Sequence, residues 1–309
     1  MTPVGDTAPG PHERPGRLGV GIIGAGRVGA VLGAALAGAG HTVVGASAVS
    51  AASIERLEVL LPGVPRLDPL EVARRAELVL LAVPDDALAD LVAGLAAVGA
   101  WQTGQLVVHT SGRHGVAVLA PAAAAGAIGL AVHPAMTFTG TSLDLARLPG
   151  AVMAVTASPV VLPIAQALVL EMGSEPVVVA EEARAAYHAA LAHVANHLVT
   201  LVAQGIDVLA GAGVERPSRV LAPLAGAALD NALRLGDTAL TGPVSRGDTD
   251  TVAAHLRVLD AGPVAGAAAT YRALAGATVG RVAASGALDA DAVRRLRELL
   301  GADPGEADR

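Results

Sequence analysis

Hydrophobic positions divide the chain into two regions with different periodicity. Before about residue 180, short apolar runs of strand length alternate with segments in which apolar residues recur at helical spacing. The expected strands cover 18–23, 41–46, 77–83, 105–109, 128–132, 151–156 and 175–179. The expected helices cover 28–39, 53–61, 68–75, 85–95, 116–125 and 159–172. This alternation predicts an α/β fold with a doubly wound, mostly parallel sheet covered by helices on both faces.

After residue 180 the strand pattern stops and long helical patterns take over. They cover 181–210, 217–235, 248–259, 263–285 and 289–300, with Asp289 as an expected N-cap and Gly301 as an expected helix end. We therefore expect a disordered lead-in at 1–16, a sheet domain at 17–180, an all-helical domain at 181–301 and a frayed tail at 302–309.

The first apolar run leads into glycines spaced G-x-G-x-x-G, at Gly24, Gly26 and Gly29. Gly24 permits a tight turn, Gly26 lets the backbone approach a diphosphate, and Gly29 allows close packing of the following helix. The helix start at Arg27 and Val28 adds free N–H groups for phosphate binding. Because a strand precedes the motif and a helix and a second strand follow it, we predict a Rossmann-type dinucleotide site.

The second strand lacks the acidic residue that would bind the ribose hydroxyls in an NAD-preferring site. Its end runs from Gly45 to Ser53 with small side chains, among them Ser47, and without a carboxylate. Small hydroxyls leave room for a 2′-phosphate, and Arg56 lies close in sequence. We therefore expect NADP(H) to be favoured over NAD(H), with Ser47 in the cofactor site.

Composition removes several kinds of chemistry. The 309-residue chain has neither lysine nor cysteine, which excludes Schiff-base formation, thiolate catalysis and cysteine metal ligation. A net charge of −7 offers no basic surface to nucleic acid. Two uncharged stretches, 116–144 and 148–166, are interrupted by prolines and glycines, which argues against a membrane span. We expect a soluble, cytoplasmic protein that binds neither nucleic acid nor a membrane.

Three strand ends carry polar or restricted residues at the edge where an open parallel sheet binds its ligands. They bring Pro84, His109, Ser111 and His133 to that edge. We assign the first three to the cofactor and His133 to the substrate, although a structural hydrogen bond would also explain either histidine. The two acids after Pro84 are expected to stabilise a helix N-terminus instead.

The helix expected at 181–210 places His188, His193 and Asn196 within one arc of about 120°. Short, neutral, hydrogen-bonding side chains suit the wall of a cleft, although a solvated face is the alternative. His193 and His197 stand four residues apart, as in some zinc sites. No third ligand accompanies them in the sequence, so we expect no metal site.

A loop between two later helices contains Thr241, Arg246 and Asp248 among glycine and proline. Arg246 offers a planar fork for a substrate carboxylate, and Asp248 is expected to cap the next helix. An ion pair of Arg246 with Asp248 or Asp250 is an equally good explanation. We assign the loop to the binding of a small substrate that carries a carboxylate.

Four motifs together resemble a bacterial family that pairs a Rossmann-like domain with a C-terminal domain of unknown function, DUF2520. They are His109-Thr110-Ser111-Gly112, His133 to Phe138, Asn196-His197-Leu198 and Thr241 to Asp248, and the resemblance extends over about 18–300. The family is similar in architecture to ketopantoate reductase, pyrroline-5-carboxylate reductase and 6-phosphogluconate dehydrogenase. The resemblance implies an NAD(P)-dependent oxidoreductase that works in a cleft between its domains and forms a homodimer through its helices.

One departure from those enzymes bears on mechanism, because the lysine that donates the proton in ketopantoate reductases has no counterpart here. Our leading hypothesis is NADPH-dependent reduction of a small 2-keto acid such as ketopantoate. His188 or His193 would supply the proton, Asn196 would orient the carbonyl, and Arg246 would bind the carboxylate. The alternatives are an imine reductase of the pyrroline-5-carboxylate type, whose substrate arrives protonated, and a non-catalytic NADP(H)-binding sensor.

Overall fold

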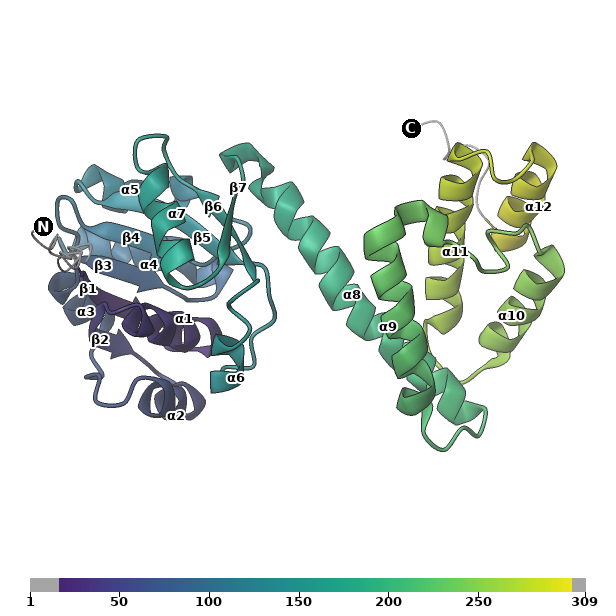
Figure 1. Ribbon diagram of the computed structural model, residues 1–309, viewed down its shortest axis with the longest axis horizontal. Coiled ribbons are helices and arrows are strands. Elements are labelled where there is room, and N and C mark those ends of the chain that lie inside the picture. Colours follow the sequence, from purple (N-terminus) through teal and green to yellow (C-terminus); the bar gives the residue numbers. More distant parts are fainter. Residues whose placement is uncertain (1–16, 302–309) are drawn as a thin grey trace, which may run out of the picture. The chain divides into compact units, whose positions relative to one another are not determined.

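The computed structural model describes residues 17–301, so the expected lead-in at 1–16 and tail at 302–309 lie outside the described residues. The chain forms two compact units, Met1–Leu191 and Ala192–Arg309 (Figure 1). The first unit holds the sheet, and the second is helical. The division between them falls inside one long helix, α8 (Arg184–Gly211).

The sheet of the first unit has seven strands in the order β2-β1-β3-β4-β5-β6-β7. Strands β1 to β5 are parallel, whereas β6 and β7 run parallel to each other and antiparallel to β5. The strands are β1 (Gly19–Ile23), β2 (Thr42–Ser47), β3 (Leu78–Leu81), β4 (Leu106–His109), β5 (Ile128–Pro134), β6 (Val152–Thr156) and β7 (Glu175–Val178). The expected strands and the mostly parallel α/β sheet are confirmed.

Two apolar cores fill the two faces of the sheet. Alternate strand residues supply them, as Ile22 and Ile23 of β1 do. One core lies under α1 (Arg27–Gly38), α2 (Ala51–Leu60) and α7 (Leu162–Glu171), and the other under α3 (Pro69–Arg75), α4 (Asp85–Ala97) and α5 (Ala120–Ala124). Strands that are apolar on both faces require this double covering, which explains their uninterrupted hydrophobic runs.

Two local predictions need correction. The segment 116–125 forms a 3₁₀ turn (Val116–Leu119) followed by the short helix α5, rather than one helix. Pro121 lies in the first turn of α5, where the missing N–H of proline is tolerated, so a new helix starts there. A four-residue helix, α6 (Ser142–Leu145), was not expected, because so short a segment has no helical periodicity to read.

The second unit packs the C-terminal part of α8 with four further helices, α9 (Pro217–Leu235), α10 (Thr249–Ala261), α11 (Ala267–Ala284) and α12 (Ala290–Leu300). Its buried core is small and is supplied by α10, α11 and α12, with Val252, Val279 and Leu296 at its centre. The expected caps are confirmed. Asp289 Oδ1 accepts a hydrogen bond from Ala292 N at 2.7 Å, and Gly301 ends α12 with a φ of +71°.

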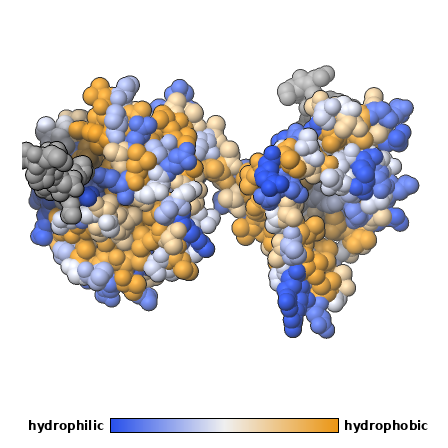
Figure 2. Space-filling model, in the orientation of Figure 1, coloured by the Kyte–Doolittle hydropathy of each residue, from blue (hydrophilic) through white to orange (hydrophobic). Residues whose placement is uncertain are grey.

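Helices α8 and α9 expose apolar surface. By length and composition alone, the segment Glu181–Gly211 is sufficient to cross a membrane, with a mean hydropathy of 1.3, and none of its most apolar window is buried. Arg184 is the only buried residue of α8, and α9 has none. The described chain therefore leaves many apolar side chains of both helices exposed, such as Val199, Leu224 and Leu233, and Figure 2 shows apolar surface on this unit.

Candidate active site

The glycine motif lies in the turn between β1 and α1. Gly24 has a φ of +97°, and a methyl group there would lie 2.6 Å from the carbonyl oxygen of Ala82. A methyl group at Gly29 would lie 2.1 Å from the carbonyl oxygen of Gly24. Both positions therefore require glycine, the first for its left-handed backbone and the second for close contact between helix and turn.

The middle glycine leaves open space where a diphosphate would approach. No atom lies within 4 Å of the position that a methyl group on Gly26 would take, and α1 starts at Arg27 without a side-chain cap. The N–H groups of the first helical turn, including that of Val28, are free to bind an anion. Ser47 braces the turn from β2, because its Oγ accepts a hydrogen bond from Gly24 N at 3.1 Å. These residues fit the diphosphate of a dinucleotide.

The strand order places this turn at a topological switch point. The chain leaves β1 toward β2 on one side and returns on the other side at β3. Open α/β sheets bind ligands at the carboxyl ends of strands where the order reverses in this way. Pro84 follows β3 as the N-cap of α4, and Asp85 and Asp86 occupy the first turn of that helix, as expected.

His109 at the end of β4 is fully buried, and both of its ring nitrogens are used by the loop that follows. Nε2 lies 2.8 Å from the carbonyl oxygen of Gly115, and Nδ1 accepts a hydrogen bond from Ser111 N at 3.2 Å. The Oγ atom of Ser111 accepts from His114 N at 3.1 Å. The side chains of His109 and Ser111 are therefore buried and hydrogen-bonded within the loop, which they hold in shape at this edge of the sheet. Neither presents an exposed side chain to a ligand.

Two charged side chains tie the start of α8 to the same edge. The guanidinium of Arg184 is almost completely buried and donates at 2.7–3.3 Å to oxygens of two neighbouring strands, β5 and β6, and of the loop after β4, at Ala131, Ala154, Thr156 and Ser111. The carboxylate of Glu181 accepts from Val116 N at 2.7 Å and Ala117 N at 3.1 Å. The orientation of the first turns of α8 is thus fixed by the sheet itself.

This anchoring brings two α8 side chains against the end of β5. The hydroxyl of Tyr187 lies 2.9 Å from Nδ1 of His133. The rings of His133 and His188 meet edge to face with centroids 6.2 Å apart. A methyl group at Gly112 would lie 2.7 Å from His188 and 2.9 Å from His133, so the loop after β4 packs directly on both imidazoles. Gly112, His133, Tyr187 and His188 are called the His–Tyr cluster below.

The electrostatics of this cluster favour neutral side chains. Burial first, and the charges of Arg184 and His188 next, lower the pKa of His133 to about 4. Burial likewise lowers the pKa of His109 to about 4, against the raising effect of its bond to Gly115. Burial raises the pKa of Tyr187, and the Arg184 charge opposes this rise. Near neutral pH the cluster therefore holds a neutral His133 and a protonated tyrosine hydroxyl beside a buried positive charge.

Sequence reasoning singled out His133 and His188 but missed Arg184, Tyr187 and Gly112. Arg184 is the only charged residue in the first twenty residues of a long apolar helix, and Tyr187 is one of only two tyrosines in the chain. Their spacing of three also places them on the same side of the helix as each other. These signals were present, but the partner strands of both side chains lie far away in the sequence.

The remaining predicted site residues belong to the second unit. His193 is exposed, and its Nδ1 lies 3.0 Å from Nδ1 of His197. Asn196 is exposed as well. Among residues 17–301, no three potential metal-ligating side chains come together.

In the loop before α10, Arg246 donates to the carbonyl oxygen of Thr241 and forms no ion pair with another described residue. Asp248 caps α10 as expected, since its Oδ1 accepts from Thr251 N at 3.0 Å. Hydrogen bonds from Thr251 lower the pKa of Asp248. The guanidinium of Arg246 is therefore available to an external carboxylate, whereas the carboxylate of Asp248 is committed to the helix.

The second unit also contains an apolar cavity of about 560 Å³ between α8, α9, α10 and α11. Its wall includes Val244 and Ser245 of the same loop, together with His255 and Tyr271. His255 Nδ1 and the Tyr271 hydroxyl lie 2.9 Å apart, so this unit has a histidine–tyrosine pair of its own.

The sheet order, the glycine turn and the helical second unit define a Rossmann-type dinucleotide-binding architecture with a helical extension. Residues 5–134 match the model of the Rossmann-like domain, and residues 151–278 match that of the domain of unknown function DUF2520. The chain therefore joins these two domains in the order that the motif resemblance implied. No curated protein matches the sequence.

Several solved structures share the fold along almost their whole length. A Bacteroides fragilis protein provisionally assigned as an NADP oxidoreductase is 23% identical with a TM-score of 0.71, over 85% of this chain and 98% of that one. An imine reductase from a Pseudomonas species is 16% identical with a TM-score of 0.63, over 92% and 100%. The pyrroline carboxylate reductase of Plasmodium falciparum, with NADP bound, is 11% identical with a TM-score of 0.51, over 91% and 98%. At these identities the likeness establishes the fold alone.

Proposed function

We propose that this protein is an NADP(H)-dependent reductase of a small 2-keto acid, such as ketopantoate. The observation that carries the proposal is the pairing, on one sheet, of an open glycine cradle with the His–Tyr cluster at the carboxyl edge. The cradle fits a diphosphate, and the cluster offers a proton donor in the same unit. The names of the structural relatives, which include NADP oxidoreductases and imine reductases, support the same class of reaction.

A bound nicotinamide would supply the hydride to the carbonyl carbon. Negative charge then develops on the carbonyl oxygen, and a proton must reach it. The hydroxyl of Tyr187 donates this proton while Nδ1 of His133 returns one to the tyrosine oxygen, and Nε2 of His133 then takes up from bulk solvent the one proton that the net reduction consumes. His133 thus begins and ends neutral, in keeping with its low pKa. This relay replaces the lysine that the chain lacks.

Arg184 supports this step without touching the substrate. Its charge is buried beside Tyr187, with the guanidinium carbon 6.0 Å from the centre of the tyrosine ring. A fixed positive charge in a desolvated place stabilises negative charge that develops nearby. We therefore expect Arg184 to favour the oxyanion and the transient tyrosinate over their protonated forms.

The test is Tyr187→Phe, assayed with ketopantoate and NADPH. Loss of a general acid lowers kcat by roughly 10²–10⁴-fold, and cofactor binding should not change. The matched control is Tyr271→Phe, which removes the hydroxyl of the other tyrosine–histidine pair, at the same 2.9 Å separation. His188→Ala and His193→Ala test the two donors favoured by sequence alone. An undiminished kcat for Tyr187→Phe would reject the relay.

A second candidate is an imine reductase of the pyrroline-5-carboxylate type. The neutral state of His133 and Tyr187 favours it, because a substrate that arrives as a protonated imine requires no strong acid. Turnover of a cyclic imine that survives Tyr187→Phe, with no turnover of keto acids, would select this candidate. If the protein binds the cofactor but turns over neither a keto acid nor a cyclic imine, the remaining hypothesis is a non-catalytic NADP(H)-binding sensor.

The preference for NADP(H) over NAD(H) rests on the end of β2. No carboxylate lies between Gly45 and Ser53, and Ser47 is occupied with bracing Gly24. Arg56 is half-buried on α2 nearby. A phosphate on the ribose therefore meets small hydroxyls and a cation rather than a repelling acid. Tighter binding of NADH than of NADPH would refute this preference.

We also propose that a second copy of this chain covers α8 and α9, as the family resemblance implies. Both helices expose large apolar side chains, among them Val199, Leu224 and Leu233. Charged residues such as Asp207, Asp230 and Arg234 interrupt these surfaces, which suits a protein partner better than lipid. Within such a cytoplasmic homodimer, Arg246 would bind the substrate carboxylate and Asn196 would orient its carbonyl.

A further inference from the structure

Two arginines meet at a glycine in the loop between β5 and β6. Gly140 has a φ of +80°, and a methyl group there would lie 2.6 Å from Nε of Arg56 and 3.0 Å from Cγ of Arg27. Arg27 belongs to the first turn of α1, and Arg56 belongs to α2. The turn around Gly140 therefore packs directly on the stems of both side chains.

Both arginines lack an acidic partner. Among residues 17–301, neither forms an ion pair or a side-chain hydrogen bond. Other described arginines also lack an acidic partner, but these two pack on the same glycine turn. Two arginine side chains that pack on the same turn without a carboxylate form a local excess of positive charge, which a doubly charged anion would neutralise. A phosphate monoester carries nearly two negative charges at neutral pH and accepts the hydrogen bonds that guanidinium donates.

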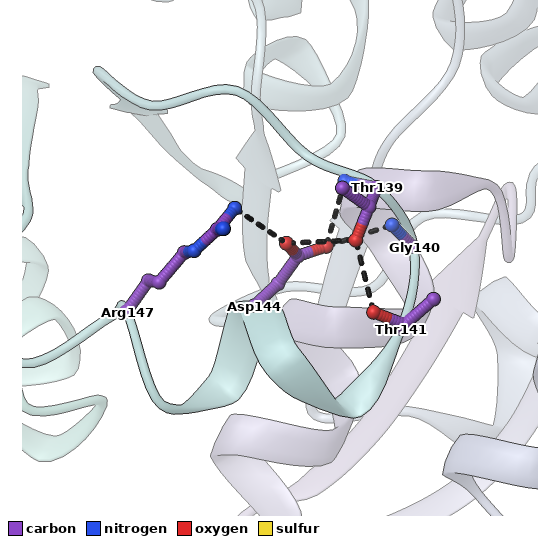
Figure 3. A network of polar contacts seen from close by, with 5 residues as sticks. All are labelled: Thr139, Gly140, Thr141, Asp144 and Arg147. Carbon is purple, nitrogen blue, oxygen red and sulfur yellow. Dashed lines mark hydrogen bonds and ion pairs between the residues drawn. The ribbon is translucent and has the colours of Figure 1, made fainter. Parts of the chain in front are cut away.

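The turn is held in place by one buried carboxylate, Asp144 (Figure 3). Its side chain is 0% exposed and accepts from Gly140 N at 2.7 Å and from Thr139 N at 2.9 Å. It also accepts from the Thr139 hydroxyl at 3.0 Å, and Arg147 approaches to 3.9 Å. Although burial opposes ionisation, the bonds from Gly140 and Thr139 lower the pKa of Asp144. Asp144 therefore remains charged and fixes the turn without neutralising Arg27 or Arg56.

We propose that the turn Thr139–Thr141, locked by Asp144, is a positioning element that holds Arg27 and Arg56 together as the binding site for the 2′-phosphate of NADP(H). This assignment rests on the proposed function, because it presumes a dinucleotide in the glycine cradle. Selectivity for the phosphate then depends on a loop about 85 residues distant in sequence from Arg56, and not on the end of β2 alone. Gly140 and Asp144 act through the arginines and need not touch the cofactor.

Gly140→Ala tests the assignment, with Gly63→Ala as the matched control. Both glycines have a φ of +80°, so both substitutions impose the same backbone strain, but no atom lies within 4 Å of the methyl position at Gly63. Only the Gly140 variant pushes Arg56 and Arg27 away. The readout is the ratio of the Kd for NADH to the Kd for NADPH, measured by fluorescence titration. We expect this ratio to fall at least about 10-fold in Gly140→Ala and to stay unchanged in Gly63→Ala.

Asp144→Asn provides a second variant if Gly140→Ala does not fold, which circular dichroism would reveal. The amide keeps the volume but weakens the grip on two backbone N–H groups, and we expect a smaller fall of the same ratio. Its control is Asp68→Asn, where a carboxylate caps α3 by accepting from Glu71 N at 2.8 Å.

The outcomes separate this assignment from the proposed function. In one outcome, the wild-type protein binds NADPH more tightly than NADH, and neither Gly140→Ala nor Asp144→Asn changes the ratio of the two Kd values. This outcome overturns the positioning role and leaves the proposed function intact. A wild-type protein that binds NADH at least as tightly overturns the NADP(H) preference, and the phosphate site with it. A loss of affinity that is equal for both cofactors marks general disruption and also counts against the assignment.

Discussion

The two units of this chain use similar apolar residues with different results. In the first unit, both faces of the sheet are covered by the chain's own helices, and leucines such as Leu32, Leu78 and Leu130 are almost completely buried. In the second, Leu224 is 66% exposed and Leu233 is 80% exposed, and α9 buries no residue. A helix that is apolar around most of its circumference is stable in water only when something covers it. The first unit therefore covers its apolar surface within one chain, whereas α8 and α9 leave apolar side chains exposed, and the dimer proposed above would cover them.

The largest expected effect is on assembly. Leu229 and Leu233 lie one turn apart on α9, and burial of each is worth about 1.5–3 kcal/mol. In a symmetric dimer each substitution acts twice, so Leu229→Gln with Leu233→Gln should weaken self-association by at least about 100-fold. Sedimentation equilibrium measures this change. Val160→Gln, at a position of the first unit that is 88% exposed, is the control and should change nothing. If the wild-type protein stays monomeric in solution, the proposal that a second chain covers α8 and α9 is wrong.

The next effect concerns Arg184, where the helix that continues into the second unit is anchored in the first. Arg184→Met keeps the length of the side chain but leaves four oxygen acceptors without their donor. Each unsatisfied buried acceptor costs about 1–3 kcal/mol, partly recovered by relaxation, so we expect a loss of about 3 kcal/mol or more. Urea denaturation measures the loss. The pKa of His133 should also rise, because the Arg184 charge helps to lower it. A variant of wild-type stability would show that the anchor is dispensable.

Glycine-to-alanine substitutions should change the folding stability in opposite directions in the two units. Gly29→Ala places a methyl group 2.1 Å from a backbone oxygen, and overpacking of this kind costs about 1–3 kcal/mol or more. Gly280→Ala in α11 meets no atom within 4 Å and should stabilise the helix by about 0.5–1 kcal/mol. Thermal unfolding of both variants measures whether each substitution raises or lowers the stability. Stabilisation by Gly29→Ala would contradict the packing of the glycine turn.

The smallest expected effect is a change in pH dependence. Since the pKa of His109 is about 4 in the fold and near 6.5 when exposed, the unfolded chain binds the extra proton between these values. Stability from this residue is therefore present above pH 6.5 and is lost as the pH falls toward 4, by at most about 1.4 kcal/mol per pH unit. His109→Asn, which can still accept from Ser111 N, should make the pH profile of the urea midpoint shallower. Identical profiles would show that His109 is not buried as described.

Much of the fold could be predicted from the sequence, because strands, turns and helix caps depend on patterns within a few residues. Apolar runs located all the strands, and the spacing of Gly24, Gly26 and Gly29 predicted a tight turn, an open approach and a close helix contact, as the backbone has them. Caps at Asp248 and Asp289 were predictable for the same reason, because each binds an N–H three residues away.

The candidate site was predictable only in part. His133 and His188 were singled out because histidines at a strand end and on an apolar helix are unusual, but His109 has the same sequence signal and turns inward. Which histidine faces the cluster is decided by the anchoring of α8 through Arg184, whose acceptors lie in the loop after β4 and on β5 and β6. No periodicity or spacing encodes those contacts.

The sequence by itself determined the order of strands and helices, the glycine turn and the chemistry that a chain without lysine or cysteine can perform. The tertiary structure alone decided that Tyr187 meets His133, that Gly140 brings Arg27 and Arg56 together, and that α8 and α9 lie uncovered. The physical reason is the distance along the chain between the residues that interact. Turns and helix caps depend on neighbours within a few residues, whereas a buried guanidinium or the packing of two arginines on Gly140 depends on segments that only tertiary folding brings into contact.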